Sequence, residues 1–309
     1  MAKLQSTEIV GVANRPATIC NNTMCFWFDT TNFIPMASYC GYIGGVWSTG
    51  GALATARYGL AGAGIQNEGL VMGGGIPTNV TCTEEYNGTS WSAGGALITA
   101  RQRLAGAGTQ NSGLAMGGRT TTACTEEYNG TSWSTGGALS TARYALAGAG
   151  TQNEGVVFGG YFSLACTEEY NGTSWSAGGA LITGRHFLSG VGTQNSGLAI
   201  GGSNIATSCT EEYNGTSWTK GGALISGRTD MAAAGAQNSA ITMGGNGCSE
   251  EYDGTSWSTT SALIIGRTIL AGEGTQFSAL VAGGYSNSIG TNACTEEYNK
   301  SISIIDIRL

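Results

Sequence analysis

The chain has 309 residues, of which 53 are glycine and 3 are proline. Charged residues make up 11% of it, against about 25% in an ordinary soluble domain, and the formal net charge is −7. An acidic chain does not suit the nucleic-acid backbone, so we expect no nucleic-acid partner. Apolar residues reach 41%, with 7 Trp and 12 Tyr, which excludes a solvated, disordered chain. No apolar run approaches the roughly 18 residues that cross a membrane, so we expect no membrane insertion.

The first 41 residues differ in kind from the rest. They hold two of the three prolines, Pro16 and Pro35, and the neighbouring aromatics Phe26, Trp27 and Phe28. They contain no apolar stretch of the kind that opens a secretory signal, so we expect synthesis in the cytoplasm. We interpret residues 1–41 as an N-terminal docking arm or as extra strands.

From residue 42 onward the sequence repeats itself with a long period. The phrase Cys-Thr-Glu-Glu-Tyr-Asn-Gly-Thr-Ser-Trp begins at Cys82 and returns five more times, with changes in the last two copies. Successive tyrosines of the phrase are 42, 42, 43, 39 and 46 residues apart. Such a period indicates a supersecondary unit of several elements rather than a short solenoid coil. The six tyrosines are Tyr86, Tyr128, Tyr170, Tyr213, Tyr252 and Tyr298.

Each unit reads as four short strands, which the second unit illustrates at 101–110, 113–118, 124–128 and 132–134. The Asn129-Gly130 pair predicts a type I′ hairpin turn, because both central positions of that turn need positive φ. One four-stranded sheet cannot bury both of its faces, whereas six sheets arranged radially can, each packing on its neighbours. We therefore predict an all-β fold, a β-propeller of four-stranded blades. Six blades are expected, with seven as the alternative.

The repeated residues also resemble a known family. A Gly-Gly doublet after an apolar strand, followed by Glu-x-Tyr, a turn and Trp, resembles the kelch repeat. The phrase Thr-Glu-Glu-Tyr-Asn-Gly-Thr-Ser-Trp is more similar still to glycine-rich kelch-like arrays in virion proteins of marine bacteriophages. The resemblance covers residues 42 to about 298. It implies a kelch-like propeller in a phage particle, and its short units imply compact loops and shallow faces.

The array does not begin cleanly, which bears on how the ring closes. Residues 42–51 match the end of a unit, but nothing upstream matches the first two strands of a unit. The last unit, which opens at Arg267, has its first three strands and lacks its Trp. We therefore predict a propeller at 42–299 in which the strand around Trp47 completes the last blade. Residues 300–309 are expected to form a tail strand. A seventh blade would need two strands from residues 1–41 and one from the tail.

Each unit carries one arginine that opens its first strand and one glutamate in its third strand. Alternate strand residues point the same way, so Glu126 should share the blade-facing side with Tyr128. A buried charge without a partner is too costly, so we expect six partly buried ion pairs that set the register of the blades. The expected residues are Arg57, Arg101, Arg143, Arg185, Arg228 and Arg267 with Glu84, Glu126, Glu168, Glu211, Glu250 and Glu296.

Six of the nine cysteines occupy one position in successive units, and we expect them to be small buried residues beside the tyrosine. Equivalent positions on neighbouring blades should exceed the roughly 7 Å Cα limit of a disulfide. In the N-terminal segment, Cys20, Cys25 and Cys40 could bridge or bind metal. Three thiols do not complete a structural zinc site, so we expect free thiols and no metal.

No motif indicates catalysis or a cofactor. His186 is the only histidine, which excludes a site with two histidines, and we interpret it as a loop or packing residue. Glycine runs such as Gly62-Ala-Gly64 lack the Lys-Ser/Thr of a phosphate loop. Glutamates spaced along a strand are poorly placed around one Ca²⁺. We predict that the chain is not an enzyme and has no catalytic residues, cofactor or metal.

The units differ most in the loop between their second and third strands. These loops should emerge on one face, and their Thr, Asn, Ser and Tyr residues suit hydrogen bonding and stacking on sugars. The alternative is that the loops vary only because such turns are unconstrained.

The first hypothesis for the function is a phage virion protein that recognises a host-surface glycan. The second is a structural capsid decoration or tail connector protein bound through residues 1–41 or the tail, and both place the chain in the virion with other virion proteins as partners. The candidate ligand-binding residues are Arg119, Tyr161, Phe162, Asn204, Tyr285 and Asn287.

Overall fold

The computed structural model describes residues 24–29, 34–42, 44–119, 123–203, 208–245 and 247–308, with the backbone alone at 24–42 and 302–308. The chain divides into two compact units. The larger unit is Val46–Asn299, and the smaller one combines residues of Met1–Gly45 and Lys300–Leu309. The described part of the chain contains no helix long and apolar enough to cross a membrane.

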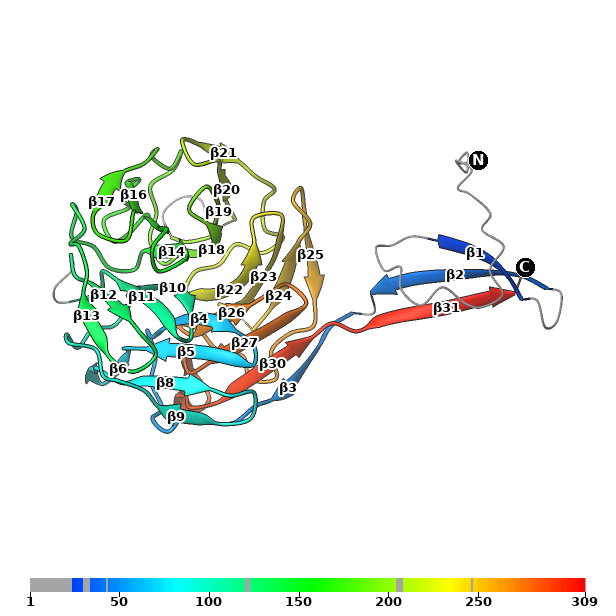
Figure 1. Ribbon diagram of the computed structural model, residues 1–309, viewed down its shortest axis with the longest axis horizontal. Coiled ribbons are helices and arrows are strands. Elements are labelled where there is room, and N and C mark those ends of the chain that lie inside the picture. Colours follow the sequence, from blue (N-terminus) through cyan, green and yellow to red (C-terminus); the bar gives the residue numbers. More distant parts are fainter. Residues whose placement is uncertain are drawn as a thin grey trace. The chain divides into compact units, whose positions relative to one another are not determined.

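The larger unit is a β-propeller of six four-stranded antiparallel blades, as predicted, with the first strand of each blade nearest the axis (Figure 1). The first three blades are β4 (Ala61–Ile65), β5 (Glu68–Met72), β8 (Thr83–Tyr86) and β9 (Trp91–Ala93); β10 (Ala105–Thr109), β11 (Ser112–Met116), β12 (Thr125–Tyr128) and β13 (Trp133–Thr135); and β14 (Ala147–Gly150), β15 (Gly155–Phe158), β16 (Thr167–Tyr170) and β17 (Trp175–Ala177). The last three are β18 (Ser189–Thr193), β19 (Ser196–Ile200), β20 (Thr210–Tyr213) and β21 (Trp218–Lys220); β22 (Met231–Ala236), β23 (Ser239–Gly244), β24 (Ser249–Tyr252) and β25 (Trp257–Thr260); and β26 (Ala271–Gly274), β27 (Ser278–Ala282), β30 (Thr295–Asn299) and β3 (Val46–Thr49).

The last blade is assembled from both ends of the propeller sequence. β3 pairs antiparallel with β30, and Trp47 stands opposite Tyr298. The start of the propeller sequence therefore supplies the outer strand of the sixth blade, which closes the ring. The alternative of seven blades is wrong. The strands it would have needed, β1 (Met24–Asp29), β2 (Ile34–Tyr42) and β31 (Ile302–Arg308), form a separate sheet in the order β1-β2-β31.

The innermost strands are built from small residues because six of them converge on the axis. In β10, a Cβ on Gly106 would come within 2.4 Å of the carbonyl oxygen of Gly62 in the first blade, so only glycine fits there. The expected first strand at 101–110 is shorter in the structure, because residues 101–104 form its entry and β10 begins at Ala105.

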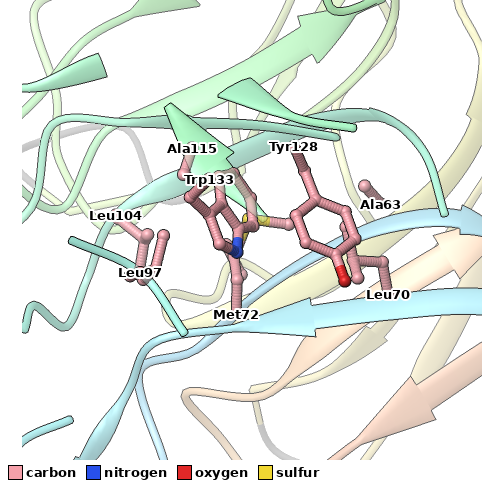
Figure 2. Packing of buried hydrophobic residues seen from close by; sticks show 9 residues of the cluster. Ala63, Leu70, Met72, Leu97, Leu104, Ala115, Tyr128 and Trp133 are labelled. Atoms are coloured by element: carbon pink, nitrogen blue, oxygen red, sulfur yellow. The ribbon is translucent and has the colours of Figure 1, made fainter. Parts of the chain in front are cut away.

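The hydrophobic core is divided into layers between neighbouring blades. Figure 2 shows one of them, where Leu70 and Met72 of the first blade meet Leu104, Tyr128 and Trp133 of the second. The rings of Tyr128 and Trp133 lie 4.9 Å apart, and Leu70, Met72 and Tyr128 are fully buried. Each blade is therefore stabilised by its neighbours rather than by a core of its own.

Polar contacts also join the blades, and they recur around the ring. The Tyr128 hydroxyl donates to Glu85 Oε1 of the preceding blade at 2.5 Å, and Gln110 Nε2 donates to the carbonyl oxygen of Tyr86 at 2.7 Å. At the seam between the sixth and first blades, the Tyr86 hydroxyl donates to Glu297 Oε1 at 2.6 Å. Burial, together with the hydrogen bond to Glu85, raises the pKa of Tyr128 to about 12.

The same seam contains an acidic residue where the other blades have alanine or valine. Glu273 in β26 is 4% exposed and lies against Gly62 and Gly69 of the first blade, which leave room for its carboxyl group. Burial raises the pKa of Glu273 well above its usual value. The seam therefore holds a neutral carboxylic acid at acidic pH, and deprotonation works against closure of the ring.

The predicted type I′ turn is wrong. Tyr128 pairs with Trp133, so the turn has four residues, and within it only Gly130 has a positive φ, of 86°. Asn129 Oδ1 instead accepts hydrogen bonds from the backbone N–H groups of Thr131 and Ser132, at 3.0 and 2.9 Å. The asparagine side chain accepts the backbone hydrogen bonds of the turn, so Asn129 itself does not need a positive φ.

Candidate functional site

The loops between the second and third strands leave all six blades at the same end. The chain enters each innermost strand at that end too, because backbone hydrogen bonds join the entry of a blade to the start of its loop. Bridges of this kind link Tyr58 to Gly75, His186 to Ser203 and Thr268 to Tyr285. We call this end of the propeller the loop face. It comprises the connections β5–β8, β11–β12, β15–β16, β19–β20, β23–β24 and β27–β30, together with the strand entries beside them.

Beneath the loop face, the six arginines and six glutamates singled out in the sequence meet as ion pairs. Both side chains of every pair are at most 4% exposed. Arg101 and Glu126 lie 3.0 Å apart, for example. Each pair joins the entry of a blade to the third strand of the same blade. The full set is Arg57–Glu84, Arg101–Glu126, Arg143–Glu168, Arg185–Glu211, Arg228–Glu250 and Arg267–Glu296.

In the second to fifth blades the arginine of the pair also donates to backbone carbonyl oxygens at the base of the loop. Arg143 Nη1 donates to the carbonyl oxygens of Gly159 and Cys166, at 3.2 and 2.8 Å, on either side of the third-blade loop. Glu168 accepts the backbone N–H of Ser140 at 2.6 Å, from the segment that crosses over from the second blade. Burial lowers the pKa of Arg143, and attraction to Glu168 opposes that shift. These hydrogen bonds tie the base of the third-blade loop to its own blade and to the crossover segment.

The repeat cysteines lie at the ends of these loops, and the prediction that they are buried is wrong. Cys166 and Cys248 are exposed, the other four are half-buried, and all six are free thiols. Each one precedes the third strand, whose first residue, such as Thr125, takes the inner position instead. Cys20 lies outside the described residues, as do the side chains of Cys25 and Cys40.

Two predicted ligand residues, Tyr161 and Phe162, lie in an aromatic cluster that we define as Tyr144, Tyr161, Phe162, His186 and Phe187. Tyr161 stacks on Tyr144 with ring centroids 4.6 Å apart, and it contacts Phe162 at 4.7 Å and His186 at 5.4 Å. Phe162 is 86% exposed, and its φ of 67° is one that L-residues rarely adopt. A strained backbone that holds an apolar ring in solvent is typical of a functional constraint.

His186, which the sequence led us to interpret as a loop or packing residue, also lies beside two serine hydroxyl groups. Its Nδ1 lies 3.4 Å from the hydroxyl of Ser163, and its Nε2 lies 2.9 Å from that of Ser203. Burial lowers the pKa of His186, so the ring is neutral at pH 7. It packs against Phe187 at 4.7 Å and so connects the aromatic cluster to the centre of the loop face.

At that centre, six equivalent residues surround the propeller axis. The N–H of each donates to the carbonyl oxygen of its counterpart in the preceding blade, at 2.7–3.0 Å, and the six bonds close into a ring. All six have φ between 54° and 66°. The ring consists of Gly59, Arg103, Ala145, Phe187, Asp230 and Ile269. They line a shallow pocket of about 80 Å³ over the axis, which we call the axial pocket.

The side chains of this ring differ in every blade. Arg103 Nη1 lies 3.0 Å from Asp230 Oδ1, and each side chain is about one-fifth exposed. The Arg103 guanidinium carbon also lies 4.4 Å from the centre of the Phe187 ring. Burial raises the pKa of Asp230, and Arg103 opposes that shift. These residues were not predicted from the sequence, although every unit reads Arg-x-x-Leu or Arg-x-x-Met and both middle positions vary.

Tyr285 and Asn287 lie at a second, larger pocket between the fifth and sixth blades, which we call the side pocket. It has a volume of about 400 Å³, and residues 285–288 form one wall of it beside Thr268. The long sixth-blade loop folds as a hairpin, β28 (Tyr285–Ser286) with β29 (Gly290–Thr291), whereas the fifth-blade loop is short. The other described residues that line the side pocket are Gly245, Gly247, Gly266 and Arg267.

Arg119, another predicted ligand residue, lies beside the aromatic cluster, where its charge works against the raised pKa of Tyr144. Arg119 is exposed, and its backbone is held by Gln102 and Asn79, with the Asn79 amide donating to its carbonyl oxygen at 3.1 Å. Asn204 lies outside the described residues. Sequence reasoning thus named parts of the aromatic cluster and of the side pocket, and missed the axial residues between them.

The chemistry of the loop face is that of hydrogen bonding and stacking. Within the described ranges, no three His, Cys, Asp or Glu side chains gather closely enough to hold a metal ion. No model of a known protein family matches the chain, and no curated protein matches it either. The six blades of four strands are consistent with a kelch-like repeat fold.

Proposed function

We propose that this chain is a non-enzymatic bacteriophage virion protein that binds a host-surface glycan through the loop face. The observation that carries the proposal is the side pocket, a concave site of about 400 Å³ on the face where the repeats differ. Ligand sites are concave and combine an apolar or aromatic wall with a few placed polar groups. The side pocket has this combination in Tyr285 and the polar residues around it.

The lining of the side pocket suits a sugar. Thr268, Ser286, Asn287 and Ser288 supply hydroxyl and amide groups that both donate and accept hydrogen bonds. Tyr285 is 40% exposed and offers a ring face on which the apolar side of a sugar can stack. Among the described residues that line the pocket there is no acidic side chain.

The virion part of the proposal rests on the resemblance of the repeated phrase to phage kelch-like arrays. It is tested by labelling phage particles that contain the protein with a Fab raised against the propeller, followed by electron microscopy. We expect label at tail or fibre tips. An even coat over the head would favour a decoration protein, and unlabelled particles would remove the viral assignment.

The glycan part is tested on an array of neutral and acidic saccharides. We expect Tyr285→Ala and Phe162→Ala to weaken binding without lowering the melting temperature, because both side chains are exposed at the loop face. Ile65→Ala is the matched control, since Ile65 is 52% exposed at the opposite end of β4. Binding that survives both loop-face substitutions, or that is lost equally in Ile65→Ala, would contradict the assignment.

A capsid decoration or tail connector protein is the second candidate, favoured by the separate β1-β2-β31 sheet. A connector would bind through residues 1–41 or the tail and leave the loop face idle. Deleting residues 1–36 separates the two functions. A glycan-binding protein keeps its array signal after this deletion, whereas a connector loses incorporation into particles and shows no glycan signal in either form.

A further inference from the structure

We propose that the loop face binds a linear, uncharged polysaccharide lying across the propeller axis, with one sugar seated over Arg103 and Asp230. This inference rests on the proposed glycan binding, and it adds the class of the ligand and a contact at the centre of the face.

The proposal starts from a continuous row of side chains that crosses the loop face. One half of the row is the aromatic part already described, from Phe162 through Tyr161 and His186 to Phe187. Arg103 covers Phe187 and pairs with Asp230 across the axis, because the second and fifth blades stand opposite each other in a ring of six.

The row continues on the far side of the axis into the side pocket. Thr268 Oγ1 donates to the carbonyl oxygen of Asp230 at 3.1 Å, and Thr268 pairs with Tyr285 through their backbones. The row therefore runs from the third-blade loop to the sixth-blade loop, which are also opposite each other. A ligand that touches Phe162 and Tyr285 together has to be extended and has to pass over the axial pocket.

The axial pocket offers what the middle of a sugar chain needs. Asp230 accepts hydrogen bonds from hydroxyl groups, Arg103 donates them, and Phe187 supplies an apolar surface. Gly59 and Ala145 also line the pocket, and their small size leaves room above them for a ligand. The backbone ring holds all of these residues in place before a ligand arrives, which reduces the entropy lost on binding.

The charges of the row favour an uncharged chain. Arg103 and Asp230 neutralise each other, and the other members of the row carry no formal charge with His186 neutral. The protein as a whole carries a net charge of −7, which repels a polyanion. A neutral polysaccharide is not repelled by the net charge of the protein and does not need a charged partner in the row.

Stability does not account for the Arg103–Asp230 pair. The backbone ring forms equally at Gly59, Ala145 and Ile269, so it does not depend on charged side chains. A partly exposed ion pair also contributes little to the free energy of unfolding. A pair that is dispensable for the fold and placed at the centre of a variable face is explained by a ligand.

The test is calorimetric titration of the full chain with oligosaccharides of graded length from cellulose, dextran, mannan and galactan, and with alginate as an acidic chain. We expect the affinity for one neutral series to rise with length until the ligand spans the row. Asp230→Asn should lower the affinity for the longest member at least about tenfold, the effect of losing a charged hydrogen-bond acceptor. The affinity for the monosaccharide should not change.

The control is Asp253→Asn, the same substitution in the same blade. Asp253 lies in the turn between β24 and β25, at the opposite end, where other blades have asparagine, and this variant should bind like the wild type. Asparagine tolerates the left-handed backbone at position 230, so Asp230→Asn should remain folded.

The outcomes separate this inference from the proposed function. Affinity that is independent of length, or an Asp230→Asn variant that binds like Asp253→Asn while Tyr285→Ala fails to bind, would overturn the axial seat and leave glycan binding intact. Tighter binding of alginate than of any neutral chain would overturn the ligand class. A wild type that binds no saccharide of any length would overturn the proposed function as well.

Discussion

Replacing one buried arginine tests whether the ion pairs hold the blades in register. Arg143→Met removes the guanidinium group but keeps a long side chain that fills much of the same space. The substitution leaves the carboxylate of Glu168 inside the third blade, where it still accepts the backbone N–H groups of Ser140 and Thr141 at 2.6 and 3.2 Å. It also removes the donor to the carbonyl oxygens of Gly159 and Cys166.

The magnitude follows from this burial. Breaking a buried pair by removing one partner costs about 3–5 kcal/mol, because the other charge stays buried and uncompensated. In a domain of this size that loss corresponds to a fall in melting temperature of about 6–20 °C. The double variant Arg143→Met/Glu168→Gln should lose less, about 1–3 kcal/mol, because glutamine is neutral and its single amide oxygen can still accept one of the two backbone N–H groups, which now bond to separate carboxylate oxygens.

The assay is thermal and urea unfolding of the wild type, the two variants and Lys220→Met as a control. Lys220 is an exposed residue at the end of β21, and its replacement should change the free energy of unfolding by less than about 0.5 kcal/mol. An Arg143→Met protein with the melting temperature of the wild type would refute the reasoning. So would a double variant less stable than Arg143→Met.

Two further predictions concern stability and pH. Glu273→Ala, which installs the residue found at Ala149, should raise the melting temperature at pH 8 and have little effect near pH 4. The pKa of Glu273 is raised in the folded state, so the penalty for burying it is absent below the unfolded pKa and grows as the pH rises. The exposed Glu68→Ala variant should show no such widening gap between pH 4 and pH 8, and a gap that stays constant would contradict the account. Tyr128→Phe should lose about 1–2 kcal/mol through the missing bond to Glu85, as measured by urea unfolding at pH 7. Because the pKa of Tyr128 is raised to about 12, its contribution is present below pH 10 and lost toward pH 12, so the difference between the two proteins should shrink over that range; a constant difference would show that the hydroxyl group is not the cause.

Most of the propeller is predictable because the sequence repeats the same unit six times. The period, the alternation around Tyr128 and the incomplete units at either end together indicate the number of strands and blades. The arginine–glutamate pairs follow from a general rule, since a charged residue repeated on a buried face needs a partner.

Local backbone geometry was harder to predict where the same residues are compatible with two conformations. Asn129-Gly130 suits a type I′ turn, but the asparagine side chain caps a four-residue turn instead. Cys124 alternates with Tyr128 along one strand pattern, yet β12 begins one residue later, which leaves the cysteine half-buried. In both places a shift of one or two residues at a strand end decided the outcome.

The functional face was the least predictable part. Loop variation pointed to Tyr161, Phe162 and Tyr285, because length and composition change there. The axial ring depends on hydrogen bonds between residues about 40 positions apart, all in left-handed backbone, and no local pattern encodes that arrangement. Arg103 and Asp230 are 127 residues apart in sequence, so only closure of the ring brings them together.

The most direct test of the central claim is a crystal structure of the protein with the saccharide that gives the strongest array signal. The account predicts sugar density on the loop face, against Tyr285 in the side pocket and over Arg103 and Asp230 at the axis. Sugar bound at the opposite end of the propeller, among the Asn-Gly-Thr-Ser turns, would contradict it.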